Sequence, residues 1–107
     1  MENTELNING TIYVPKQEKN SPIKICILQR GWIMVGHYSE EGDNCKLENS
    51  ATIRTWGTTK GLGELALEGK TSKTILDFNH GIVRFHRLTI VCTIDCNQEI
   101  WTKTLIK

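Results

Sequence analysis

Hydrophobic residues are densest between Ile23 and Tyr38, where they occupy both alternating faces of an extended chain. The segment is rich in β-branched and aromatic residues, which favour strands. Gly31 falls where the alternation weakens, so we expect a bulge or bend there that splits the segment into two strands. A segment that is apolar on both faces is either buried on both sides or lies in an oligomer interface. We place Trp32 and Met34 in the core.

Shorter strands are predicted after this segment. Ser39–Asn44 has the composition of a hairpin connection, and the chain then returns through Cys45–Trp56. Thr71–Phe78 is predicted to form another strand, and the turn residues Asn79–Gly81 are predicted to reverse the chain after it.

The longest predicted strand is Ile82–Ile94. Its apolar residues change parity midway, so the register must slip near His86 and Arg87 if both sets are to reach one core. A bulge at that point would turn Arg84, His86 and Arg87 outward together.

Helical periodicity is clear in Leu62–Glu68, which carries a Leu/Ala stripe at i, i+3 and i+4 and is followed by Gly69. A helix of about two turns is not stable alone, so the stripe must dock on the sheet. Asp95–Lys107 suits a short closing helix or an edge strand equally well.

These elements predict a single domain over residues 1–107. Met1–Gly10 is polar and expected to be flexible, and Thr11–Val14 is a short strand closed by Pro15. Six or seven short strands with one short α-helix define a mainly β fold, either a small barrel or a compact sandwich.

Composition narrows the class of function. The 107 residues include 13 basic and 12 acidic side chains, and a net charge of +1 gives no broad field for nucleic acid or a membrane surface. No segment approaches the ~20 apolar residues of a membrane span, and we expect a cytoplasmic protein with reduced cysteines. Cys92 and Cys96 lack Cys-x-x-Cys spacing, so we interpret the four cysteines as packing thiols and expect no metal.

The candidate binding site is the loop Gly57–Gly63, which leads from a predicted strand into the helix. Free N–H groups and the helix dipole favour negative charge there. Thr58, Thr59 and Lys60 add hydroxyl donors and one cation. The candidate N-cap is Thr59 or Gly61, with Glu64 three places beyond Gly61. The alternative is a tight turn whose glycines only let the backbone reverse and the helix pack.

Two residues before the loop extend this hypothesis. Arg54 and Trp56 share one strand face, and guanidinium and indole planes both accept a flat ligand. The alternative is an arginine that shields an exposed indole. Arg84, His86 or Arg87 would close the site if their strand lies adjacent.

The apparent catalytic and nucleotide-binding motifs lack the spacing or the neighbouring elements that such sites require. Gly61–Ala66 fits Gly-x-Gly-x-x-Gly/Ala, but no second strand-helix-strand unit follows it. The chain also does not match the phosphate loop of nucleotide hydrolases, Gly-x-x-x-x-Gly-Lys-Ser/Thr. Gly63 lies one place too far from Gly57, and Glu64 follows it in place of the lysine. The histidines and carboxylates show no catalytic spacing, so we expect a protein that is not an enzyme and needs no cofactor.

Four stretches stand out between residues 30 and 101: Arg30-Gly-Trp-Ile-Met-Val-Gly, Leu47-Glu-Asn-Ser-Ala-Thr-Ile-Arg-Thr-Trp, Gly-Leu-Gly-Glu-Leu-Ala-Leu-Glu-Gly and Thr93-Ile-Asp-Cys. Together they resemble a group of small bacteriophage and prophage proteins that has no established activity. The resemblance implies a phage or bacterial cytosolic setting and no chemistry. The loop reads Gly-Thr-Thr-Lys-Gly in this chain, where we expect some members of the group to be richer in serine and alanine. A phosphate-binding role for Lys60 would therefore be restricted to part of the group.

Two hypotheses follow. In the first, the chain is a non-enzymatic phage accessory protein that binds a small anionic, nucleotide-like ligand at the Gly57–Gly63 loop and sequesters a host defence signal. In the second, it is a phage structural or protein-interaction module, a homo-oligomer whose apolar segment Ile23–Tyr38 is buried between subunits.

Overall fold

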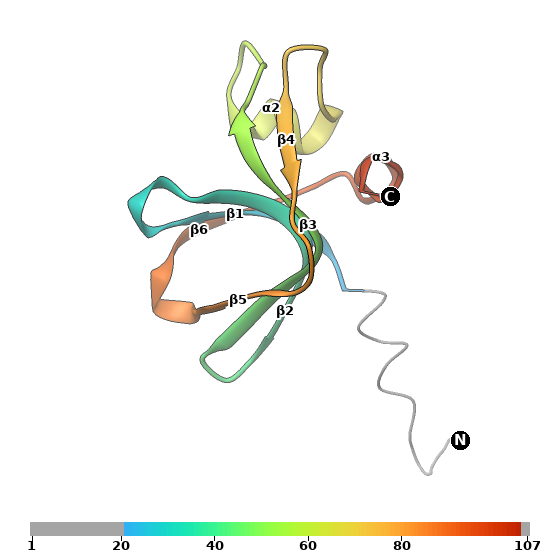
Figure 1. Ribbon diagram of the computed structural model, residues 1–107. Helices are drawn as coiled ribbons and strands as arrows, with labels where there is room; N and C mark the ends of the chain where they lie inside the picture. Colours follow the sequence, from blue (N-terminus) through green and yellow to red (C-terminus); the bar gives the residue numbers. More distant parts are fainter. Residues whose placement is uncertain (1–20, 106–107) are drawn as a thin grey trace, which may run out of the picture.

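The computed structural model describes residues 21–105, which form one antiparallel sheet with short helices (Figure 1). The prediction of a mainly β fold is confirmed. Met1–Gly10 and the predicted strand Thr11–Val14 lie outside the described residues. The elements in chain order are β1 (Ile23–Leu28), η1 (Gln29–Gly31), β2 (Ile33–Glu41), β3 (Asn44–Thr55), α2 (Leu62–Glu68), β4 (Ile75–Phe78), β5 (Val83–His86), η2 (Arg87–Thr89), β6 (Ile90–Asp95) and α3 (Gln98–Thr104).

The strands lie in the order β4-β3-β2-β1-β6, and β5 also pairs with β3. Both β4 and β5 run antiparallel to β3, with Phe78 opposite Ala51 and Val83 opposite Leu47. The prediction that residues 79–81 reverse the chain is therefore wrong, because they carry it onward along the same edge of β3. The strand predicted over Thr71–Phe78 is shorter than expected, since residues 71–74 form a turn in which the Thr74 N–H donates to the Thr71 carbonyl at 3.1 Å.

The single strand predicted over Ile82–Ile94 is two strands separated by η2, at the point where the parity change predicts a slip. His86 ends β5 because its Nδ1 accepts from the Leu88 N–H at 3.0 Å, and its carbonyl accepts from the Thr89 hydroxyl at 2.6 Å. The short η2 links the β3 side of the sheet to the β1 side, so the sheet curls as in a barrel (Figure 1). β5 and β6 do not pair, and the described sheet remains open.

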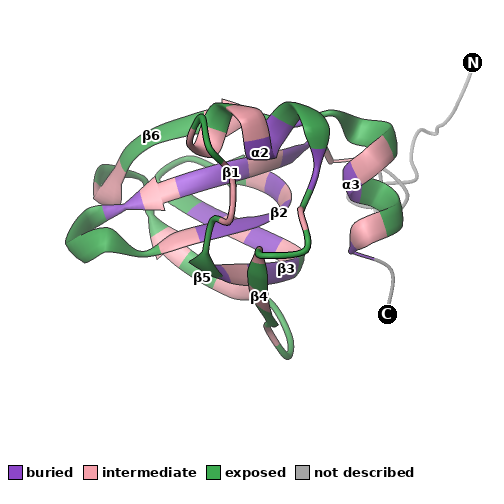
Figure 2. Ribbon diagram, turned by 90° about the horizontal axis from the view of Figure 1, so that it is seen from above, coloured by how far each residue is buried: buried purple, intermediate pink, exposed green. Residues whose placement is uncertain are grey.

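Buried residues lie along β1, β2 and β3, which are partly purple in Figure 2, and they form two separate cores. The helix-side core consists of Ile23, Ile25, Val35, Ala51, Ile53, Leu65, Ala66, Cys96, Trp101 and Leu105. The sheet-side core, inside the curl, consists of Cys26, Leu28, Met34, Tyr38, Cys45 and Leu47. β1 supplies alternate residues to each core. Of the two interpretations of the Ile23–Tyr38 segment, burial on both sides within the chain is the one observed.

A bulge lets β3 serve both cores. The register with β2 shifts at Gly36, and Asn49 in β3 has a left-handed φ of 48°. The extra residue reverses the side-chain alternation, so Leu47 faces the sheet-side core and Ala51 the helix-side core. Gly36 is required opposite the bulge, because a Cβ there would lie 2.5 Å from the Cβ of the fully buried Ser50.

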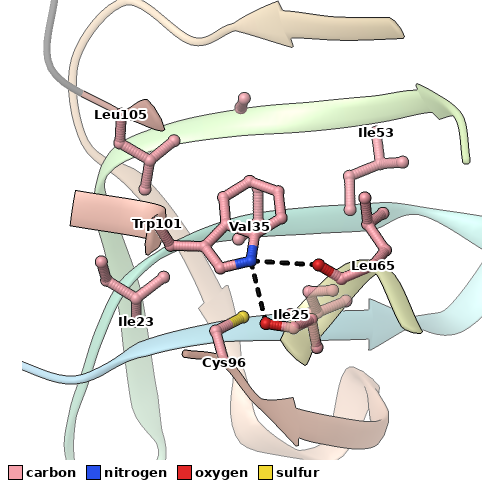
Figure 3. Close-up of a cluster of buried hydrophobic side chains, with 10 residues drawn as sticks. Ile23, Ile25, Val35, Ile53, Leu65, Cys96, Trp101 and Leu105 are labelled. Carbon is pink, nitrogen blue, oxygen red and sulfur yellow. Dashed lines mark hydrogen bonds between the residues drawn. The ribbon is translucent and has the colours of Figure 1, made fainter. Parts of the chain in front are cut away.

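Two short helices cover the helix-side core. α2 has the bounds expected from its Leu/Ala stripe, and the C-terminal alternatives resolve as the helix α3. Trp101 of α3 is fully buried, and its indole Nε1 donates to the carbonyls of Leu65 and Ala66 at 3.1 and 3.0 Å (Figure 3). These bonds satisfy two carbonyl groups of α2. Neither described α-helix is long and apolar enough to cross a membrane.

The connection between β1 and β2 is a tight turn of three residues, Gln29–Gly31, closed by the hydrogen bond that the Leu28 N–H donates to the Trp32 carbonyl at 2.7 Å. Arg30 has φ 69° and ψ 17° and Gly31 has φ 82°, so both residues adopt left-handed conformations. The expected division at Gly31 is confirmed. The core assignment holds for Met34, but it is wrong for Trp32, which is 57% exposed because the turn places it at the hairpin end.

We predict opposite effects for the same substitution at two glycines. Gly36→Ala should lower the free energy of unfolding by about 1–3 kcal/mol, because the new methyl group overlaps Ser50. Gly63→Ala, which has open space around its Cβ inside α2, should raise it by about 0.5–1 kcal/mol. Urea unfolding measures both, and a Gly36→Ala variant as stable as the parent chain would contradict the close packing at the bulge.

Candidate functional site

The loop between β3 and α2 is held against the turn before β4. The Thr71 hydroxyl donates to the Gly57 carbonyl at 2.7 Å, and the Thr74 hydroxyl donates to the Trp56 carbonyl at 2.6 Å. Gly57 has φ 73°, and a Cβ there would fall on the backbone of Lys73 and Thr74. The glycine is thus required by packing, which is the structural alternative to a ligand-binding role.

The N-terminus of α2 holds a carboxylate from its own chain. Glu64 Oε1 accepts from the Lys60 N–H at 2.9 Å and lies 3.4 Å from the Thr59 hydroxyl. The Thr58 hydroxyl donates to the carbonyl of Gly61, the N-cap residue, at 2.7 Å. Glu64 supplies the negative charge that a helix N-terminus favours. An external anion would therefore have to displace Glu64 to reach the Lys60 N–H and the Thr59 hydroxyl.

The strand face before the loop is also engaged within the chain. Arg54 forms a two-pronged pair with Asp77 of β4, in which its Nε and Nη2 each donate at 2.9 Å. Trp56 is 42% exposed, and the cation–ring contact found among the described residues is instead Lys24 over Tyr38, at 5.5 Å. Lys60 is exposed at the tip of the loop, with no side-chain ion pair among residues 21–105.

Arg84 and His86 lie on a different part of the sheet. They are paired with Lys46 and Asn44 in the first half of β3, whereas the loop follows its far end. The eight residue-to-residue steps from Lys46 to Arg54 correspond to roughly 26 Å of extended strand. The structure thus groups Arg54, Trp56, Thr58, Thr59, Lys60 and Gly61 at one end of β3, but it does not bring Arg84 or His86 to them.

Instead, His86 and Arg87 approach the turn between β2 and β3. Arg87 Nη2 lies 3.2 Å from Asp43 Oδ1, and His86 Nε2 lies 3.9 Å from Asp43 Oδ2. The Arg87 N–H also donates to the Asp43 carbonyl at 2.8 Å. These contacts hold η2 against the β2–β3 hairpin, which explains the outward-facing His86 and Arg87 without a ligand.

Three of the four thiols are packing groups, and the prediction is wrong for Cys92. Cys26, Cys45 and Cys96 are buried, and Cys92 is exposed. Burial raises the pKa of Cys26 to about 12 and that of Cys96 to about 12, so neither forms the thiolate required of a nucleophile or metal ligand near neutral pH. Among residues 21–105 no group of three His, Cys, Asp or Glu side chains is placed to hold a metal ion.

A second surface, which we call the turn-end patch, consists of Trp32, Leu88, Arg30 and Arg87. Leu28 connects its two parts, because the Leu28 N–H donates to the Trp32 carbonyl at 2.7 Å and Leu28 pairs with Ile90, which follows η2. Figures 1 and 2 place the β1–β2 turn and η2 at the same end of the sheet. Trp32 is 57% and Leu88 73% exposed. Strand periodicity missed this surface, although Arg-Gly before the tryptophan is compatible with a tight turn.

Comparison of the chain with protein-family models gives no match, and comparison with curated proteins gives none either.

We predict that the carboxylate of Glu64 stabilises the loop. Glu64→Ala should lower the free energy of unfolding by about 1 kcal/mol, because the Lys60 N–H loses its acceptor at the helix N-terminus. Glu64→Gln keeps an acceptor oxygen and should cost less than half as much. Equal losses in the two variants would assign the effect to charge and not to the hydrogen bond.

We also predict a loss of stability in alkaline solution. The Cys26 thiol ionises at its ordinary pKa of 9.0 in the unfolded chain but keeps its proton to about pH 12 when folded. The unfolded state then binds fewer protons, so stability falls by about 1 kcal/mol per such thiol between pH 9 and 10. Urea unfolding at both pH values should show a smaller loss in Cys26→Ala, with exposed Cys92→Ala as the control.

Proposed function

We propose that this chain is a non-enzymatic protein-binding module that contacts its partner through the turn-end patch. The observation that carries the proposal is the exposure of Trp32 and Leu88, each within two residues of an exposed arginine in sequence, on two turns at the same end of the sheet. Leaving such apolar side chains in water forgoes about 1.5–3 kcal/mol each. Tryptophan and arginine are also the residues that contribute most often to the energetic centre of protein interfaces.

The chemistry of the patch indicates the kind of partner surface. Its centre is apolar, which suits a partner with a hydrophobic pocket for the indole ring. Arg30 adds positive charge beside this centre, whereas Arg87 is already paired with Asp43 at 3.2 Å. An acidic side chain on the partner near Arg30 would steer association. Arg30 is held by a left-handed turn conformation that asparagine or glycine would adopt more easily, which fits a side chain retained for contact.

Both hypotheses drawn from the sequence have less support than this proposal. Against binding of a small anionic ligand, Asp77 already accepts a hydrogen bond from the Arg54 guanidinium, and Glu64 accepts one from the Lys60 backbone N–H. Oligomerisation through Ile23–Tyr38 has less support as well, because the two cores use both faces of that segment. The resemblance to phage and prophage proteins supports a setting inside a bacterial cell.

We expect the double variant Trp32→Ala/Leu88→Ser to lose its partner. The tagged 107-residue chain would be expressed in phage-infected bacteria and chemically cross-linked to the proteins that it binds. It would then be purified through its tag, and the bound proteins would be quantified by mass spectrometry. The matched control is Trp56→Ala/Leu67→Ser, which removes similar exposed groups, 42% and 63% accessible, elsewhere on the surface. Removing two central interface side chains should reduce recovery by about tenfold or more.

Circular dichroism must first show that both double variants are folded. The proposal is wrong if the patch variant recovers the same proteins as the parent chain, or if the control loses them equally. It also fails if the parent chain itself recovers no protein above a tag-only sample.

A further inference from the structure

His86 caps η2 through a ring nitrogen that carries no proton. Its Nδ1 accepts from the Leu88 N–H at 3.0 Å. A neutral imidazole has one N–H, so His86 carries its proton on Nε2, which lies 3.9 Å from Asp43 Oδ2. A charged imidazole has a proton on both nitrogens and no acceptor. Protonation of His86 therefore removes the cap, because two N–H donors would then face each other.

His37 shows the opposite arrangement. Its Nδ1 lies 2.9 Å from the Ser21 carbonyl, and a carbonyl oxygen can only accept. His37 therefore donates from Nδ1, and this hydrogen bond persists when the ring becomes charged. The two histidines consequently have opposite neutral tautomers, and acid breaks only the bond made by His86.

The cap is the contact that holds Leu88 in place. The Leu88 N–H is bonded to the His86 imidazole, and the Leu88 side chain is 73% exposed, so packing does little to fix it. Loss of the cap should therefore loosen Leu88 while the ends of η2 stay attached. Other hydrogen bonds of η2 do not involve the imidazole: the Arg87 N–H to the Asp43 carbonyl, the Thr89 hydroxyl to the His86 carbonyl and the Ile90 N–H to the Arg87 carbonyl.

Charged groups of both signs surround the ring. Asp43, in the β2–β3 turn, is shared with Arg87, whose Nη2 lies 3.2 Å from its Oδ1. No arrangement of these charges gives a charged ring an acceptor nitrogen, so the cap is lost whenever the ring is protonated. The other charged residues in the strand rows at and beside His86 are Glu41 of β2, Lys46 of β3 and Arg84 of β5.

We propose that His86 is a proton-sensitive cap that regulates the turn-end patch. Histidine is the side chain that ordinarily changes charge between about pH 5 and 8. The usual capping residues, Ser, Thr, Asn and Asp, keep an acceptor oxygen throughout that range. Acid therefore releases Leu88, one of the two exposed apolar side chains of the patch. This regulation rests on the proposed function of the patch, whereas the loosening of Leu88 does not.

NMR of the free 107-residue chain measures the cap directly. At about pH 8, ring nitrogen shifts should identify the Nε2–H tautomer in His86 and the Nδ1–H tautomer in His37. Between about pH 8 and about pH 5, the order parameter of the Leu88 N–H should fall from the roughly 0.85 of rigid backbone towards the roughly 0.6 of flexible backbone.

Two variants separate the cap from other effects of acid. His86→Asn keeps an acceptor oxygen that does not titrate, so its Leu88 order parameter should stay high at both pH values. His86→Ala has no acceptor, and its value should be low at both. The proposal is wrong if the parent chain shows no change, if His86→Asn changes equally, or if neutral His86 carries its proton on Nδ1.

A second readout tests the regulation of the patch. Proteins cross-linked to the parent chain in extracts of phage-infected bacteria should be recovered about threefold less at about pH 5 than at about pH 8, and His86→Asn should show no such loss. Equal recovery by the parent chain at both pH values overturns the regulation. No recovery by either chain at about pH 8 instead overturns the proposed function, and with it the regulation, whereas the NMR result still decides the cap.

Discussion

The close approach of Gly36 to Ser50 is the contact on which the rest of the fold depends. It allows β3 to hold one extra residue opposite β2. Because of that residue, odd-numbered side chains in the second half of β3 point to the opposite face of the sheet from those in the first half. Asn79 fixes this point from the neighbouring edge, because its Nδ2 donates to the Ser50 hydroxyl and its N–H donates to the Ser50 carbonyl, both at 2.9 Å. One six-stranded sheet can thereby enclose a core inside its curl and support two helices on the other face.

Much of this arrangement is predictable from local patterns. The two-faced apolarity of Ile23–Tyr38, the break at Gly31 and the bounds of α2 all follow from residue spacing, because each depends on neighbours close in sequence. Trp32 was misplaced because strand alternation continues through it while the chain has already turned. Residues 71–74 form a turn for a reason that periodicity does not contain, since the hydroxyls of Thr71 and Thr74 bond a backbone that precedes them by 14 and 18 residues.

The candidate site was only partly predictable for a related reason. The glycines, threonines and lysine correctly located a loop at a helix N-terminus, and Glu64, four residues after Lys60, engages the Lys60 N–H by a contact local in sequence. The engagement of Arg54 depends on the fold, because Asp77 reaches it across a strand pair 23 residues apart. Conversely, the turn-end patch depends on the pairing of Leu28 with Ile90, which no local pattern of either segment reveals.

The pair of hydrogen bonds between Gln98 of α3 and the backbone of Ile23 in β1 has a consequence for synthesis on the ribosome. Gln98 both donates to the Ile23 carbonyl and accepts from the Ile23 N–H, across 75 residues of chain. β1 is translated early, yet Trp101 must emerge before the apolar residues of the helix-side core are shielded from water. A nascent chain that stalls before α3 therefore exposes an unfinished hydrophobic surface, the kind of surface through which incompletely folded chains aggregate.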